Sequence, residues 1–235
     1  MKVWNWEGFW SYFTNLYLLE GALWTIGLTI STLVLGGLLG LVLAVMRLSK
    51  HKALSRSAQT YVWIFRGTPL LVQLIIIYTG LPQLGLYRFS VIEAAVLGLA
   101  LNEAAYLSEI LRGGILSVAK GQTEAARALG LKPFETFRLV VLPQALRVII
   151  PPLGNSVNGL LKTTSIASVI SMEEVLRRGQ ILMQQKFQVL EVFMVVAIIY
   201  LVMTTCWDFV QRRIEAYYGR AYGAVENRQL ARDDR

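Results

Sequence analysis

Three long stretches of this sequence contain no charged residue, and they set the main constraint on how the chain can fold. They cover residues 21–46, 67–87 and 192–207, and Phe209 and Val210 continue the last of them. A helix that crosses the hydrocarbon core of a bilayer, about 30 Å thick, needs about 20 mostly apolar residues. We therefore predict a membrane-spanning helix in each stretch, the second of them ended with the help of Pro82.

The overall composition agrees with a membrane protein and excludes other classes. Hydrophobic residues make up 55% of the chain and charged residues only 16%, whereas a soluble domain carries about 25% charged residues. Disordered chains have low hydrophobicity, and the single cysteine, Cys206, excludes a disulfide-based scaffold. The chain therefore has too little polar material to cover a water-facing surface.

Two more apolar segments, residues 92–111 and 139–161, carry polar residues at membrane depth. The first contains Glu93, Asn102, Glu103 and Glu109, and the second contains Arg147, Pro151, Pro152, Asn155 and Asn158. Polar side chains, and backbone freed from helical bonding by proline, are costly in lipid and occur where they face protein or a water-filled path. With these two segments, the sequence predicts an all-α integral membrane protein with five transmembrane helices.

The distribution of Lys and Arg predicts the orientation. Most of the 23 basic residues lie in residues 47–56, 112–138 and 212–235, which share one side of the membrane if the N-terminus is outside. Because cytoplasmic loops carry the excess of Lys and Arg, we predict an N-out, C-in topology, with a cytoplasmic tail at residues 213–235. Residues 162–186 are basic but fall on the outer side, and we interpret them as a re-entrant or surface helix. The pI of about 9.7 then reflects topology and not nucleic-acid binding.

Residues 1–20 do not have the pattern of a signal peptide, since they contain two acidic residues and no small-residue cleavage site after a short apolar core. Their tryptophans and tyrosines are typical of a membrane interface. We predict an amphipathic N-terminal lead-in at residues 1–19.

A short helix is predicted on the cytoplasmic side, between the third and fourth spans. Thr123 can cap a helix that starts near Glu124, and the pair Ala125 and Ala126 favours helix while allowing another backbone to approach. Gly130 is suited to end the helix. The residues alone fit equally well a docking helix and an ordinary amphipathic loop helix.

The wider spacing resembles the EAA loop of ABC importer permeases: Glu-Ala-Ala, three residues, Gly, nine residues, an aliphatic residue, one residue, then Leu-Pro. Here the pattern is Glu124-Ala125-Ala126, Gly130, Val140 and Leu142-Pro143. Residues 65–70, 105–115 and 155–166 also resemble stretches of the polar amino-acid uptake subfamily. The resemblance covers about residues 20–212.

This resemblance implies a type I ABC importer transmembrane domain at residues 20–212, with the coupling loop at about 120–143, in the bacterial cytoplasmic (inner) membrane. The implied function is that of a permease subunit, which forms a path for a polar amino acid together with a second permease copy or paralogue. The implied partners are an ATPase dimer, which binds ATP and Mg, and an extracytoplasmic amino-acid-binding protein. This chain has no phosphate loop, so we expect neither enzymatic activity nor a cofactor of its own.

The resemblance also assigns roles on the coupling helix. Glu124 would face the ATPase, Ala125 and Ala126 would allow close packing, and Gly130 would fix the turn.

Candidates for the substrate path are polar residues at membrane depth. Asn102, Glu103 and Tyr106 share a helix face with Glu109, and a second group follows the two prolines: Asn155, Ser156, Thr164 and Ser165. The alternative is structural: the glutamates pair with bases, as Glu109 and Arg112 are spaced to do, and the second group satisfies backbone. Arg66 either reaches the headgroups or pairs with an acid. The family more often has a small or hydroxylated residue where Glu103 stands, which bears on substrate choice.

Two other functions fit the sequence less well. A membrane-embedded enzyme needs a nucleophile–base pair or a metal cluster in the spans, which one His and one Cys do not offer. An ATP-independent secondary transporter usually contains internal repeats, which five spans without a duplicated motif do not supply. The sequence leaves open which amino acid is carried and whether the second permease is identical.

Overall fold

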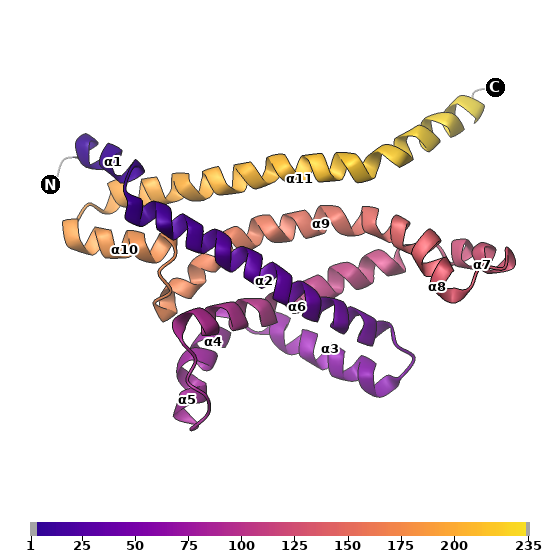
Figure 1. Ribbon diagram of the computed structural model, residues 1–235, viewed down its shortest axis with the longest axis horizontal. Coiled ribbons are helices and arrows are strands. Elements are labelled where there is room, and N and C mark those ends of the chain that lie inside the picture. Colours follow the sequence, from indigo (N-terminus) through magenta and orange to yellow (C-terminus); the bar gives the residue numbers. More distant parts are fainter. Residues whose placement is uncertain (1–3, 234–235) are drawn as a thin grey trace.

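The computed structural model describes residues 4–233, with side chains up to residue 218, and this part of the chain contains helices and no strands (Figure 1). In chain order the elements are α1 (Trp6–Phe13), α2 (Leu16–Leu48), α3 (Lys52–Gly67), α4 (Leu70–Ile75), the π-helical turn η1 (Ile76–Gly80), α5 (Leu81–Gln83), α6 (Val91–Leu116), α7 (Lys120–Ala128), α8 (Pro133–Thr136), the π-helical turn η2 (Phe137–Val141), α9 (Leu142–Thr163), the 3-10 turn η3 (Thr164–Ile170), α10 (Val175–Lys186) and α11 (Val189–Asp233).

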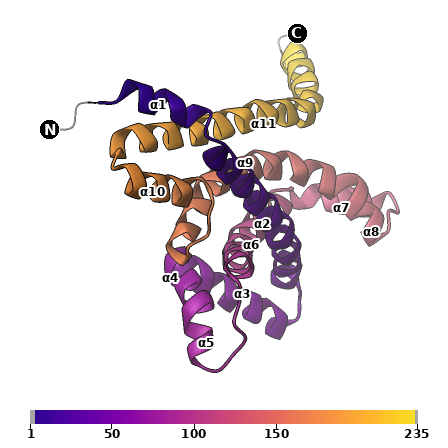
Figure 2. The ribbon, with the colours of Figure 1, turned by 60° about the vertical axis from the view of Figure 1, so that its left-hand side comes forward.

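The long helices run side by side, as expected for a membrane bundle. Four helical segments in the described residues are long and apolar enough to cross a membrane: Leu16–Leu48, Val91–Leu116, Pro133–Ile170 and Val189–Tyr218. A bent pair, Lys52–Gly67 with Leu70–Gln83, supplies a fifth span if it counts as one. Figures 1 and 2 show α1 and α10 at one end of the bundle and α7 and α8 at the other. The all-α, five-span prediction is confirmed.

The second span differs from its prediction over residues 67–87. Its helix begins at Lys52, stops at Gly67 and resumes at Leu70, with a bend of 102°. The break follows from Pro69, because a residue before proline avoids the helical region; Thr68 is extended, with φ −119° and ψ 146°. The basic residues Lys52 and Arg56, expected in a connecting loop, belong to this helix.

The fourth span is also more regular than predicted. α9 continues through Pro151 and Pro152, although the prolines were expected to interrupt it. α11 supplies donors near the prolines: Trp207 Nε1 donates to Gly154 O at 2.8 Å, and Gln211 Nε2 donates to Pro151 O at 3.5 Å. These bonds tie α11 to the backbone of α9 at and just after the prolines.

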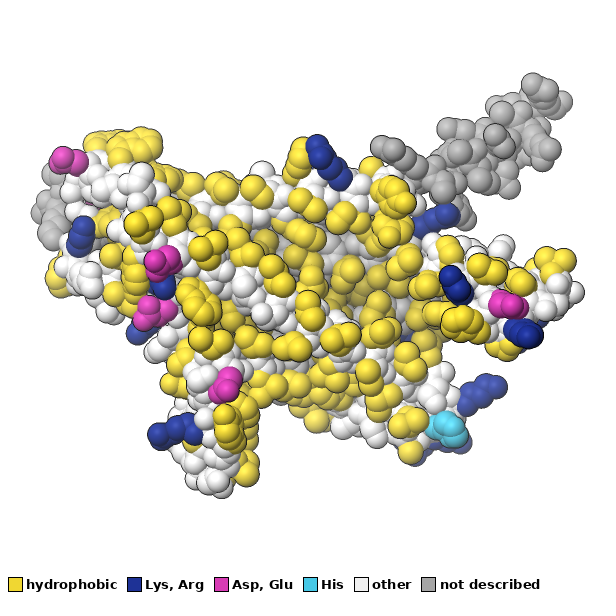
Figure 3. Space-filling view, viewed as in Figure 1, with side chains coloured by type: hydrophobic (Ala, Val, Ile, Leu, Met, Phe, Trp, Pro, Cys, Tyr) yellow, Lys and Arg dark blue, Asp and Glu magenta, His cyan; other side chains and the backbone are white. Residues whose placement is uncertain are grey.

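Residues 162–186 form the end of α9, η3 and α10. Ser171 turns the chain between η3 and α10 in the left-handed conformation, with φ 68°. α10 packs on α2 and α11, and the largely buried Arg178 pairs with Glu20 of α2 at 2.7 Å. The space-filling view shows apolar side chains over the middle of the bundle and most charged ones toward its ends (Figure 3).

α2 and α6 pack through small residues. A Cβ atom added to Gly36 would lie 3.0 Å from the carbonyl oxygen of Ala100, and one added to Gly40 would lie 3.0 Å from that of Ala104. This close approach is typical of small residues spaced by four on membrane helices, where packing rather than the hydrophobic effect drives association.

We predict that Gly40→Ala destabilises the protein by roughly 1–3 kcal/mol, because the added methyl group meets backbone that cannot move independently. Gly37→Ala is the matched control, since its nearest neighbour outside its own turn is a Leu107 side-chain atom at 3.9 Å. Unfolding of both purified variants in mixed micelles measures the difference. Equal stabilities of the two variants would contradict the packing argument.

Candidate substrate cavity and coupling helix

The largest cavity described lies where the second span breaks. It has a volume of about 790 Å³ and is lined by the α3–α4 break, α6, α9 and η3. Five predicted path residues line it: Asn102, Glu103, Tyr106, Asn155 and Ser156. Residues far apart in sequence therefore meet around one space large enough for an amino acid.

Thr164 and Ser165 are not brought to this cavity. The buried Thr164 donates its hydroxyl to Leu161 O at 2.9 Å, and Ser165 donates to Lys162 O at 2.6 Å. Ser165 lines a separate hollow between α9 and α11, beside Lys162 and Thr204. The 3-10 winding of η3 turns these hydroxyls back onto their own helix.

The broken helix is held by two amide side chains. Gln73 Nε2 donates to Phe65 O at 3.0 Å and to Thr68 O at 3.2 Å. Asn102 Nδ2 donates to Phe65 O at 3.1 Å and to Gln73 Oε1 at 3.0 Å. The carbonyls at the end of α3 thus obtain partners that the helix no longer supplies. Asn102 lines the cavity, but both hydrogen bonds that its Nδ2 donates go to the helix break.

Glu103 is the acidic group of the cavity wall that has no cationic partner. Its residue is 9% exposed, and its Oε1 accepts a hydrogen bond from the hydroxyl of Ser156. Among the described residues, no Lys or Arg nitrogen lies within 4.0 Å of its carboxylate. Glu103 therefore does not pair with a base, which was the structural alternative for this residue.

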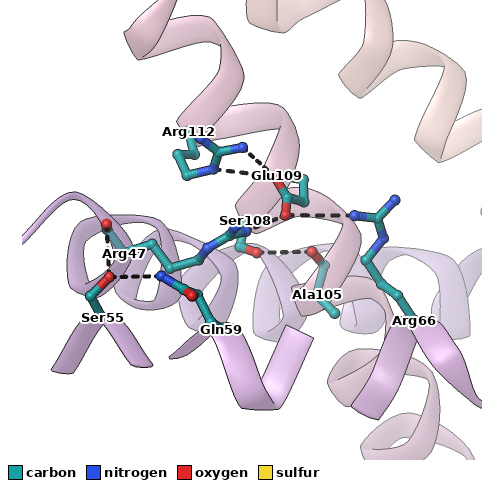
Figure 4. A network of polar contacts seen from close by, with 8 residues as sticks. All are labelled: Arg47, Ser55, Gln59, Arg66, Ala105, Ser108, Glu109 and Arg112. Carbon is teal, nitrogen blue, oxygen red and sulfur yellow. Dashed lines mark hydrogen bonds and ion pairs between the residues drawn. The ribbon is translucent and has the colours of Figure 1, made fainter. Parts of the chain in front are cut away.

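Glu109, less than two turns further along α6, is instead surrounded by arginines (Figure 4). Arg47 of α2 donates to its Oε1, and Arg112 donates to its Oε2 at 3.2 and 2.9 Å, which confirms the expected local pair. Arg66 of α3 lies 3.6 Å from Oε1. Of the two possibilities for Arg66, the structure shows pairing with an acid. Three spans are joined at this point.

The predicted coupling helix is α7, which begins at Lys120, three residues before the expected cap Thr123, and has no side-chain cap. Glu124 and Ala125 are exposed. Ala126 is 4% exposed, so its small side chain packs within the chain rather than outward. Gly130 has φ +83°, a left-handed conformation that favours glycine at a helix end.

Sequence reasoning missed several residues. Leu129 and Phe134, 84% and 70% exposed, flank Gly130 at the tip of the predicted coupling loop. In the sequence they could have been noticed as apolar residues next to the motif. Gln73 was an isolated amide in an apolar run. Asp208, within the last span, is exposed and accepts from Asn158 Nδ2 at 2.5 Å; as a charge inside a hydrophobic helix, it could have been singled out.

Residues 36–218 match the model of the family described as "Binding-protein-dependent transport system inner membrane component". The chain belongs to this family. It is a permease component of a bacterial ABC amino-acid importer, located in the inner membrane.

Individual relatives agree. The arginine transport system permease protein ArgU of Corynebacterium glutamicum is 37% identical, over 98% of this chain and 77% of that protein. The glutamine transport system permease protein GlnP of Escherichia coli is 39% identical, over 84% and 91%. The nopaline transport system permease protein NocM of Agrobacterium fabrum is 44% identical, over 77% and 78%.

Solved structures show the same fold. A crystal structure of an amino acid ABC transporter with histidines superposes with a TM-score of 0.85, at 36% identity, over 92% of this chain and all of that one. The MetNI methionine ABC transporter in an inward-facing conformation gives 0.69 at 22% identity, over 86% and 96%, and supports the fold alone.

We predict that Gln73→Leu destabilises the protein by about 1–3 kcal/mol for each carbonyl left without a partner. Gln59→Leu is the control, because Gln59 is exposed on α3 and donates only to Ser55 Oγ. The thermal midpoints of the two detergent-purified variants should differ clearly, with Gln73→Leu the lower. A Gln73→Leu protein as stable as the control would show that the break needs no side-chain donors.

Proposed function

We propose that this chain forms, with a second permease, the membrane path of an importer for a polar amino acid, and that a separate ATPase dimer drives it through α7. The observation that carries the proposal is the cavity with Glu103 in its wall. A largely buried carboxylate that accepts only one hydroxyl hydrogen bond retains acceptor capacity for a cationic group. The α-ammonium group of an amino acid supplies such a group.

We expect Glu103→Gln to reduce uptake of arginine and of glutamine to a similar extent, because both carry the α-ammonium group. Uptake of arginine, glutamine, glutamate and cystine is measured in cells that express the complete importer. Glu93→Gln, on the same helix but exposed and away from the cavity, is the control. A loss confined to arginine would assign Glu103 to the substrate side chain, and unchanged uptake would remove Glu103 from the binding site.

The position of α7 supports coupling to an ATPase. It lies between α6 and the continuous helical stretch Pro133–Ile170, and both of these line the cavity. A force applied to α7 is therefore passed directly to two cavity walls. The exposed Leu129 and Phe134 offer apolar anchors of the kind that dominate protein interfaces.

We expect Phe134→Glu to leave membrane insertion intact and to lower both ATPase co-purification and uptake, because a charge replaces an apolar anchor. Leu84→Glu is the control, since Leu84 is 75% exposed and follows α5, at a distance from the coupling loop (Figure 1). Pull-down of the ATPase and uptake are compared in the two variants. Normal uptake by Phe134→Glu would contradict coupling through this tip.

The exposed pair Asp208 and Asn158 supports a second permease. A carboxylate that faces lipid within a span is costly, so a protein surface or a shared aqueous path is expected to cover it. We further propose that the N-terminus lies outside, where a binding protein delivers the substrate. ATP and Mg are held by the ATPase, and this chain needs no cofactor.

A further inference from the structure

Arg66 is a cation in the cavity wall whose hydrogen-bonding capacity is unused. Both oxygens of Glu109 already accept from other arginines, Oε1 from Arg47 and Oε2 from Arg112. Arg66 approaches Oε1 at 3.6 Å, too far for a hydrogen bond, and no hydrogen bond joins its guanidinium to any described residue. Its side chain is 44% exposed, and it lines the cavity.

The local charge balance favours an anion beside Arg66. Three guanidinium groups share the single carboxylate of Glu109, which leaves an excess of positive charge at this point of the cavity wall. Figure 4 shows Arg66 reaching Glu109 from the side opposite Arg47. Its guanidinium also lies over the ring of Tyr106, 5.2 Å from the centroid. A planar guanidinium held in this way presents donors that match the two oxygens of a carboxylate.

Arg66 lies beside the turns of α6 that follow Glu103. Arg66 contacts Tyr106 and Glu109, which follow Glu103 by three and six residues on α6, a rise of about 4.5 to 9 Å. The carboxylate and ammonium groups of an α-amino acid, with a hydrogen bond of about 2.9 Å at each end, span a length of the same order as this helical rise. Both side chains line the same cavity.

We propose that Arg66 binds the α-carboxylate of the transported amino acid, with Glu103 receiving the α-ammonium group. The inference rests on the proposed function. The two charges would recognise the α-carboxylate and α-ammonium groups, which all amino acids share. Other parts of the cavity then select for the side chain of the transported amino acid.

The test compares binding of an amino acid with binding of its carboxamide, which keeps the ammonium group and lacks the negative charge. The complete permease–ATPase complex is purified into nanodiscs without a binding protein. The probes are L-arginine and L-glutamine with their α-amides, measured by calorimetry. We expect wild-type protein to bind the acids roughly tenfold to a hundredfold more tightly than the amides, as a charge-assisted contact implies.

Arg66→Met should lower binding of the acids to the level of the amides and leave binding of the amides unchanged. Arg112→Met is the control, because it removes another guanidinium from Glu109 but does not line the cavity, and it should keep the acid–amide ratio. Arg66→Lys, which retains the charge without the planar fork, should keep part of the ratio and serves if Arg66→Met does not fold.

An unchanged acid–amide ratio in the Arg66 variants would overturn this inference and leave the proposed function intact. Failure of wild-type protein to bind either amino acid would instead overturn the proposed substrate site, and this inference with it.

Discussion

The arrangement of this protein depends on a membrane-spanning helix that stops halfway. In a bilayer the backbone must be satisfied internally, because lipid offers no donors. At Gly67–Pro69 the helix ends, and Gln73 and Asn102 supply donors to the exposed carbonyls. α4 is thereby free to leave at 102° from α3, and the space beside the break is the cavity. Without these amides, the carbonyls at the break would have no donor from Gln73 or Asn102.

Two carboxylates on one face of α6 have opposite surroundings. Glu109 is saturated by arginines from three helices, so it joins α2, α3 and α6. Glu103, less than two turns away, has only the Ser156 hydroxyl. A charge in a poorly solvated place is stable only with a partner, and the difference leaves Glu103 able to bind a cation and Arg66 able to bind an anion. Opposite charges thus face one cavity.

The spans could be predicted from sequence because a bilayer makes apolar length decisive. The start of the second span could not, since Lys52 and Arg56 give its first half the composition of a loop. Spacing predicted a coupling motif, but it did not reveal that Ala126 packs inward while Leu129 projects. The role of Gln73 could not be predicted, because its partners are carbonyls that lack a helical donor only once the helix breaks. That Thr164 and Ser165 do not line the cavity could not be predicted, because their direction follows from 3-10 winding, which composition does not encode.

The glycine contact between α2 and α6 has a consequence for movement. Backbones that approach this closely cannot slide or separate without steric clash or loss of packing, so the two helices form a single rigid unit that carries Glu103. α9 packs against this unit: a Cβ added to Gly114 of α6 would lie 3.2 Å from the carbonyl oxygen of Ala145, and the Ser156 hydroxyl donates to Glu103. The proposed binding site therefore lies where α9 packs on the α2–α6 pair. A change in its width is also a change in how α9 packs on that pair.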